Sequence, residues 1–292
     1  MNKGLLVVCL MCLPPGGGLA QSQAGSWRLV GLINVGTVKC VALVNGSGPY
    51  GLSRRPILAE GQREDDIEVV SINAQSRSAE VRLGGTNLSS LRLPGSATES
   101  AAGIALQRAP FDQVVQMYSE FANRTVLRFP HMKQEETTLD AAANNSAEAA
   151  RLLEQAFAEK GLTIIQDGDK FAMLLPKYAI TNAHPHAPLT GTVPSANVQP
   201  AGNDYASDIL PPGVICFARV PLREVAKIYA ELTGRTLDPD APFPYTGDIS
   251  LRTQTSFSRE EAIYALETLF GWSGVQLVPE GPKLARVVPV SR

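Results

Sequence analysis

The histidines of the sequence are its best candidates for metal chemistry. His184 and His186 are separated by one proline, and Asp204 and Asp208 follow on the same stretch. Imidazole and carboxylate groups in such a set would suit zinc. A proline-rich tether leaves its side chains in water without fixing their geometry, so we interpret the two histidines as part of a solvated spacer. No metal and no other cofactor is expected.

Paired acids and nucleophile motifs give catalysis no better support. Asp238 and Asp240 flank a proline, and paired carboxylates can hydrolyse glycosidic bonds. This pair lies between predicted elements, however, and is more simply a loop. The sequence contains no GxSxG, HExxH or GxGxxG motif and no P-loop. We therefore expect a protein that is not an enzyme and has no small-molecule substrate.

The charge balance argues against a nucleic-acid partner. The chain has 26 basic and 28 acidic residues, for a formal net charge of -2 at pH 7, whereas nucleic-acid binding depends on clustered Lys and Arg. The RNA-binding KH module has a related chain order but needs a GxxG loop. The helix-to-strand corners at 122–125 and 233–236 lack that loop.

The first residues predict export. Lys3 precedes an apolar run at 5–13, which is about half the length that a membrane-spanning helix needs. Gly18 and Ala20 supply small residues at the positions that a signal peptidase recognises. We expect a signal peptide at 1–20, cut between Ala20 and Gln21, rather than an anchoring helix. The expected location is the periplasm, in association with the cell envelope.

Cysteine usage indicates no disulfide scaffold. Cys9 and Cys12 leave with the signal peptide, and Cys40 and Cys216 lie far apart in apolar runs, with no CxxC pair. Two buried thiols are favoured over a single disulfide, and the second alternative stays open.

Two segments lack apolar periodicity and are rich in small, polar and Pro residues, which is typical of linkers. They lie at 95–103 and 178–213. The remaining chain then has three parts, at 26–94, 104–177 and 214–290. The second linker would be an extended tether rather than a loop inside a compact domain.

The second and third parts repeat each other, which indicates duplicated units. Identical residues recur in the same order: Ile104, Pro110, Val114, Tyr118, Glu120, Arg124 and Thr125 match Ile215, Pro221, Val225, Tyr229, Glu231, Arg235 and Thr236, and after a short insertion Ala149, Leu153, Glu154, Phe157, Gly161 and Pro176 match Ala262, Leu266, Glu267, Phe270, Gly274 and Pro289.

Each copy is predicted to run strand, helix, strand, strand, helix, strand, strand. Apolar residues at spacings of three and four predict helices that begin after Pro110 and Pro221. The segment 258–261 is a capping box, and Asn145 or Ser146 would cap the corresponding helix. Each copy ends in a predicted hairpin. The part at 26–94 has alternating apolar residues and frequent turn signals, which predict a small antiparallel barrel or sandwich.

The repeats resemble the small βαββα modules that precede the pore in secretins of type II secretion and type IV pilus systems. The resemblance rests on 109–115 with Tyr118 and 124–127, and on 218–225 with 229–236. The leading part resembles the homology-region domain of the inner-membrane or pilus-assembly partners of secretins, through 29–33, 60–61, 67–72, 79–86 and 91–93. The implied fold is α+β: an N-terminal all-β small barrel or sandwich, then two βαββα-type modules, each with an added C-terminal β-hairpin.

The resemblance implies a function in assembly. A secretin continues into a membrane β-barrel, whereas this sequence ends at Arg292 after the second repeat, so we expect an accessory or split component. Its partners would be secretin, pilus or other secretion-system proteins, and copies of itself. The alternative is a periplasmic module that binds a peptide or a polysaccharide.

Five charged residues are candidate docking residues. Arg124 and Arg235 occupy matching corners of the repeats, although an arginine there could simply complement a helix dipole. Glu64, Asp65 and Asp66 form an acidic run that is either a solvated turn or a contact for a basic partner surface.

Overall fold

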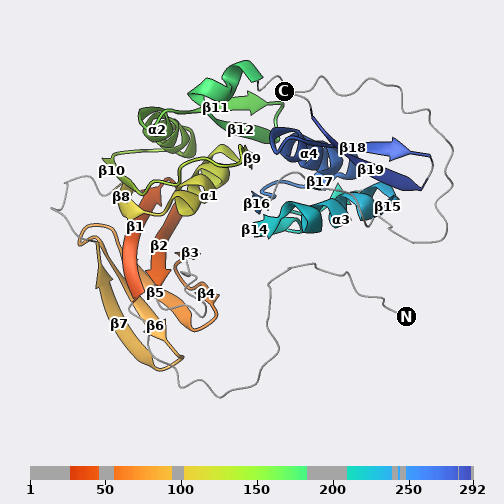
Figure 1. Cartoon of the computed structure of the whole chain (residues 1–292). Helices are drawn as coiled ribbons and strands as arrows, with labels where there is room; N and C mark the ends of the chain where they lie inside the picture. Colours follow the sequence, from red (N-terminus) through yellow and green to blue (C-terminus); the bar gives the residue numbers. More distant parts are fainter. Residues whose placement is uncertain are drawn as a thin grey trace. The chain divides into compact units, whose positions relative to one another are not determined.

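The computed structural model describes residues 27–45, 56–93, 102–182, 209–238, 243, 248–281 and 283–290, and it is a mixed α+β structure (Figure 1). The signal peptide and its cleavage at Ala20 and Gln21 lie outside these residues. The chain forms two compact units. Among the described residues, the leading unit combines those up to 122 with 133–160. The trailing unit combines 123–132 with those from 161 onward.

A five-stranded antiparallel sheet lies at the centre of the leading unit. Its strand order is β10-β8-β1-β2-β3. The strands are β1 (Trp27–Val35), β2 (Val38–Asn45), β3 (Ile57–Ala59), β8 (Gly103–Ala109) and β10 (Thr137–Ala141). The sequences of β1 and β2 are almost continuously apolar because most of their residues are buried. The sheet joins three strands of the predicted leading part to two strands of the predicted first module.

A second sheet of the leading unit is a meander of β4 (Arg63–Glu64), β5 (Ile67–Asn73), β6 (Ser78–Leu83) and β7 (Asn87–Arg92). Buried and exposed residues alternate in β5 and β6, which is typical of a sheet with one face in a core. Residues of both sheets, such as Leu32, Leu43 and Val69, share one hydrophobic core. The described strands do not close into a barrel, so the barrel alternative is wrong for this part of the chain. β3, β4, β7 and β10 remain as sheet edges.

Two helices complete the leading unit, α1 (Phe111–Ala122) and α2 (Ser146–Glu159). Both carry the predicted apolar face, since the residues at spacings of three and four are buried. The side chain of Asn145 caps α2 by accepting a hydrogen bond from the Glu148 N–H. Gln113 of α1 donates to the Leu43 carbonyl of β2 at 2.7 Å, so α1 is tied to the five-stranded sheet.

The trailing unit contains two small sheets with the same pairing pattern. In each, an antiparallel hairpin has a short parallel strand beside its second strand. The first sheet consists of β11 (Leu162–Asp167), β12 (Phe171–Pro176) and β9 (Thr125–Arg128). The second consists of β18 (Val275–Glu280), β19 (Leu284–Pro289) and β15 (Thr236–Leu237). Both predicted hairpins are confirmed.

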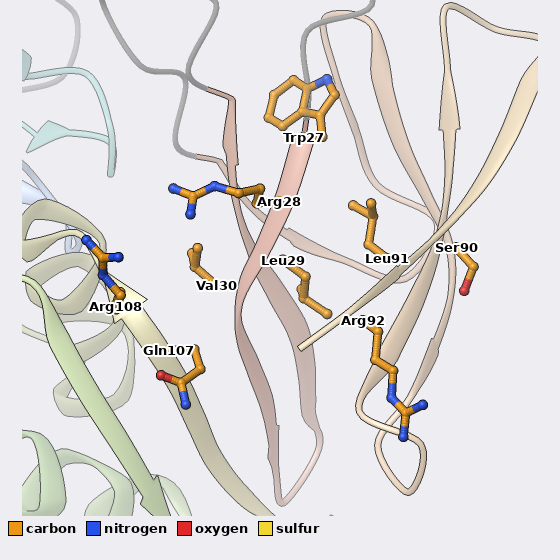
Figure 2. Close-up of a pocket in the computed structure, with 9 residues that line it drawn as sticks. All are labelled: Trp27, Arg28, Leu29, Val30, Ser90, Leu91, Arg92, Gln107 and Arg108. Carbon is orange, nitrogen blue, oxygen red and sulfur yellow. The ribbon is translucent and has the colours of Figure 1, made fainter. Parts of the chain in front are cut away.

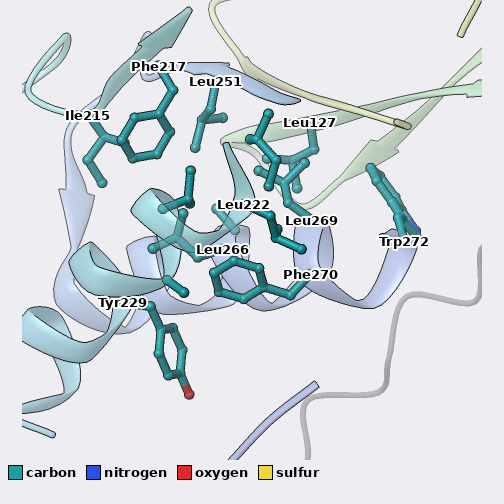
Figure 3. Close-up of a cluster of buried hydrophobic side chains, with 14 of the residues drawn as sticks. Leu127, Ile215, Phe217, Leu222, Tyr229, Leu251, Leu266, Leu269, Phe270 and Trp272 are labelled. Carbon is teal, nitrogen blue, oxygen red and sulfur yellow. The ribbon is translucent and has the colours of Figure 1, made fainter. Parts of the chain in front are cut away.

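The other elements of the trailing unit are β13 (Ile209–Leu210) with β17 (Phe257–Ser258), β14 (Cys216–Pro221) with β16 (Asp248–Arg252), the helices α3 (Leu222–Thr233) and α4 (Arg259–Trp272), and the 3-10 helix η2 (Lys177–Asn182). The capping box of α4 is confirmed, because Ser258 and Glu261 bond each other's backbone N–H. Figure 3 shows the core of this unit, where α3 and α4 pack with Leu127 of β9.

Candidate interaction site

A tyrosine–glutamate pair joins the two helices in each of the repeated segments. The Tyr118 hydroxyl of α1 donates to Glu154 Oε1 of α2 at 2.9 Å. The matching Tyr229 hydroxyl of α3 donates to Glu267 Oε1 of α4 at 2.8 Å. Both tyrosine side chains are buried, and each hydroxyl finds an acceptor in the neighbouring glutamate. The same polar contact therefore recurs at positions that the sequence repeat equates.

An aromatic contact accompanies each pair. The rings of Tyr118 and Phe157 meet edge to face, with centroids 6.1 Å apart and an interplanar angle of 78°. Those of Tyr229 and Phe270 lie 5.7 Å apart at 79°. This geometry brings the positive edge of one ring to the negative face of the other. Both helix pairs are thus held by one apolar and one polar contact of the same kind.

The first strand of each repeated segment contains an arginine in the left-handed region, Arg108 with φ 50° and Arg219 with φ 57°. The Arg108 N–H donates to the Thr138 hydroxyl at 3.2 Å, and the Arg219 N–H donates to the Ser250 hydroxyl at 3.1 Å. Both sites coincide with an irregular register between the paired strands. Such bulges bend a strand and redirect its side chains. Sequence reasoning missed them, although each arginine stands two residues before a proline.

An ion pair supports each bulge. The Arg108 Nε lies 2.7 Å from Glu136 Oε2, and the Arg219 Nε lies 3.7 Å from Asp248 Oδ2. The side chains are largely exposed, so each pair contributes at most about 1 kcal/mol. The pairs fix the direction of the guanidinium groups more than they stabilise the fold.

Arg124, one of the predicted docking residues, is half-buried and bonded within the trailing unit. Its guanidinium donates to the backbone carbonyl oxygens of Gly168 and Phe171, the latter at 3.1 Å. It therefore ties the turn between β11 and β12 to the start of β9. Arg235 is also half-buried, and its Nε is buried without a hydrogen-bond partner in the described part of the chain. The docking role of these two arginines stays a prediction.

The acidic run Glu64, Asp65 and Asp66 lies in the leading unit, at the tight turn between β4 and β5. All three residues are exposed. Arg63 Nε donates to the Asp65 carbonyl at 3.1 Å, and the Gly84 N–H donates to the Asp66 carbonyl at 2.8 Å. The backbone of the run is therefore held in place while its side chains face solvent. Its contact with a basic partner surface remains a prediction.

The residues considered for other chemistry form no site among the described positions. Cys40 and Cys216 are thiols, the first buried and the second half-buried. Burial raises the pKa of the Cys40 thiol to about 12, so it is an unreactive core residue. Asp238 is half-buried, while Asp240 and the histidines at 184 and 186 lie outside the described residues. In the described ranges, no group of three potential metal ligands converges.

No family model matches the sequence, and no curated protein matches it. None of the helices in the described part of the chain has both the length and the hydropathy needed to cross a membrane.

Removing the Tyr229 hydroxyl should weaken the trailing unit. We expect Tyr229→Phe to lower the free energy of unfolding by about 1–2 kcal/mol at pH 7, because a hydrogen bond to a carboxylate is lost. Burial, and then the charge and hydrogen bond of Glu267, raise the pKa of Tyr229 above its ordinary value of 10. The unfolded state therefore loses this proton first, and the contribution of Tyr229 declines as pH rises past 10.

Urea titrations between pH 7 and pH 11 test this expectation. The alkaline decline should be shallower in Tyr229→Phe than in the wild type, though still present because the pKa of Tyr264 is also raised by burial and by Asp167. Tyr178, which is 74% exposed in the same unit, provides the control. Tyr178→Phe should leave the stability at pH 7 unchanged. Equal slopes for Tyr229→Phe and the wild type would contradict the role of the buried pair.

Proposed function

We propose that this chain is a non-catalytic accessory or split subunit of a type II secretion or type IV pilus system, that it acts in the periplasm, and that it works by docking to other proteins. In this proposal the β-rich part at 26–94 is followed by two βαββα-type modules at 104–177 and 214–290, each with an added C-terminal hairpin. No cofactor takes part.

The observation that carries the proposal is the recurrence of one set of contacts in two segments of the chain. The tyrosine–glutamate pair, the arginine bulge and the sheet with one parallel strand all occur twice, at matching positions. A backbone hydrogen bond also recurs at matching positions. The Thr125 N–H donates to the Lys170 carbonyl at 2.8 Å, and the Thr236 N–H donates to the Lys283 carbonyl at 2.7 Å. Duplicated units that share these contacts suit a scaffold protein, in which repeated modules present separate binding faces.

Unpaired strand edges supply a means of docking. β7 is the last strand of its sheet, and all six of its residues are exposed or half-exposed. Four of them are polar or charged, and Leu88 is 60% exposed. An edge strand offers N–H and C=O groups to a partner's strand, and an exposed leucine adds apolar contact. β7 is therefore the surface that we select for testing.

Site-specific photocross-linking in the source cells tests the proposal. A photoreactive amino acid replaces Leu88, and the same amino acid at Arg151, an exposed residue of α2, is the matched control. We expect the Leu88 position to yield a cross-linked secretin, pilus or secretion-system protein, identified by mass spectrometry, and the Arg151 position to yield much less. Cross-linking only to proteins outside such systems would refute the proposal.

The peptide- or polysaccharide-binding alternative is favoured by one observation, a pocket of about 510 Å³ in the leading unit. Ligand sites commonly have volumes of about 300–1,000 Å³. Retention of envelope glycans by the purified chain, without any protein partner in the cross-linking experiment, would support this alternative.

A further inference from the structure

The pocket of the leading unit lies along the edges of three strands. It is lined by consecutive residues of each strand: Trp27, Arg28, Leu29 and Val30 of β1, Ser90, Leu91 and Arg92 of β7, and Gln107 and Arg108 of β8 (Figure 2). Successive residues of a strand point to opposite faces of its sheet. A pocket that contacts four successive residues of β1 must therefore follow the edge of this strand rather than one of its faces.

The edge in question faces β8, since β1 pairs with β2 along its whole length from Trp27 to Val35. On the other side, the register with β8 covers Gly31 to Asn34 and ends there within the described residues. The two strands thus separate at Val30 and Gln107. Among the described strands, none pairs with this side of β1 before Gly31, and Trp27 to Val30 line the pocket there.

Two bulges explain why the strands separate. The register of β1 with β2 shifts between Leu29 and Gly31. The register of β8 with β10 shifts between Thr137 and Leu139, where Arg108 has its positive φ of 50°. A bulge bends its strand and increases the local twist, so β1 and β8 diverge from the same point. The pocket is a consequence of the fold and not of loosely packed side chains.

The charge of the lining selects the kind of ligand. Arg28, Arg92 and Arg108 contribute guanidinium groups, and none of the nine lining residues is acidic. Arg108 forms an ion pair with Glu136. Arg28 and Arg92 are exposed, and they lie on two different strands that line the pocket, β1 and β7. In Figure 2 the Arg92 side chain extends away from Arg28, so the two charges are spread along the pocket. Guanidinium groups bind carboxylates through two parallel hydrogen bonds.

The lining also includes the apolar side chains of Leu29, Val30 and Leu91. Trp27 is only 7% exposed, so its ring is not available to stack on a sugar. This lining suits a chain in which apolar and acidic side chains alternate, because an extended peptide presents them to opposite sides.

We propose that this pocket binds an extended acidic peptide segment of a partner protein, which pairs with the free edge of β1 and places its carboxylates on Arg28 and Arg92. This proposal does not require the partner to belong to an export system. It specifies the class of ligand that the pocket binds, and it can be tested with the purified chain alone.

The experiment uses the full chain and two capped, fluorescent peptides of about six residues, the length of a typical strand. One alternates Glu with Val, and the other alternates Lys with Val. Fluorescence anisotropy at low salt measures both affinities. We expect the acidic peptide to bind at least about tenfold more tightly than the basic one, and its binding to weaken as salt is added.

Charge reversal locates the site. Arg28→Glu combined with Arg92→Glu should weaken binding of the acidic peptide by about tenfold or more, because two favourable charges become repulsive. The control variant Arg151→Glu reverses the charge of one arginine on α2, away from the pocket. It should alter the affinity for the acidic peptide less than about twofold. Thermal unfolding shows whether each variant is folded. If the double glutamate variant is unfolded, the double variant Arg28→Gln with Arg92→Gln takes its place.

Hydrogen exchange then tests the binding mode. Bound peptide should slow exchange of amides at 27–30 and 107–108 and leave α2 unchanged. Three results would overturn the proposal: equal binding of the two peptides, an Arg151→Glu loss as large as that of the double reversal, or protection confined to other parts of the chain. Tighter binding of an anionic oligosaccharide than of the acidic peptide at the same site would assign the pocket to a glycan instead.

Discussion

Phe270→Ala is expected to lower the free energy of unfolding of the trailing unit by about 3–5 kcal/mol. The Phe270 ring is 1% exposed and lies in the main core of that unit, where it packs edge to face with Tyr229. Truncation removes its apolar transfer energy and leaves a cavity that rigid helices cannot fill by collapsing. Phe157→Ala should cost the leading unit a similar amount, because Phe157 is also 1% exposed and contacts both Tyr118 and Phe111.

The two units can be followed separately, since the chain has two tryptophans and each unit contains one of them, Trp27 or Trp272. Urea unfolding is recorded by fluorescence in a Trp27→Phe background for Phe270→Ala, and in a Trp272→Phe background for Phe157→Ala. Leu88→Ala is the control, because a side chain that is 60% exposed buries little area. If Phe157→Ala cost less than about 1 kcal/mol while Phe270→Ala cost the full amount, the matching positions would not have equivalent environments.

Local patterns in the sequence were sufficient to predict the helices and hairpins. The faces of α1 and α3 follow from residues three and four positions apart, and the cap of α4 is formed by neighbours in the chain. The hairpins β11–β12 and β18–β19 need only a short turn between alternating segments. Each of these features depends on a stretch of sequence no longer than the element itself, which is why periodicity and turn residues could reveal it.

Long-range pairing could not be predicted in this way. β1 and β8 are far apart in the sequence, and the apolar pattern of β8 does not indicate that it pairs with β1. The sequence alone therefore gave a boundary between 26–94 and 104–177, whereas the five-stranded sheet contains strands from both sides of it. The barrel alternative has the same origin, because alternation specifies a half-buried strand but not whether its sheet closes.

The candidate binding pocket depends on structural features that residue type alone does not predict. A positive φ is rare for arginine, so no propensity argument would place bulges at Arg108 and Arg219. The signal that existed was the recurrence of an arginine two residues before a proline in both copies. Arg28 and Arg92 lie far apart in sequence and line the same pocket only because β1 and β7 belong to sheets that share a core.

Gly103→Ala tests the long-range pairing directly, and we expect it to destabilise the leading unit by about 2–4 kcal/mol. Gly103 pairs with Asn34 at the start of β8 and has a φ of 154°. A Cβ atom at this position would lie 2.3 Å from the Ala141 carbonyl oxygen and 3.0 Å from the Ala142 Cα. Both obstacles are backbone atoms, so β8 and β10 would have to move apart. A glycine that belonged only to a linker would tolerate alanine.

The control separates the steric clash from backbone conformation. Gly61, in the same unit, has a φ of 80°, and a Cβ built there meets no atom within 4 Å. Gly61→Ala should therefore cost only the conformational strain of alanine at positive φ, about 1 kcal/mol. Urea unfolding followed by Trp27 fluorescence compares the two variants. Equal losses would mean that β8 does not approach β10 as closely as the pairing requires.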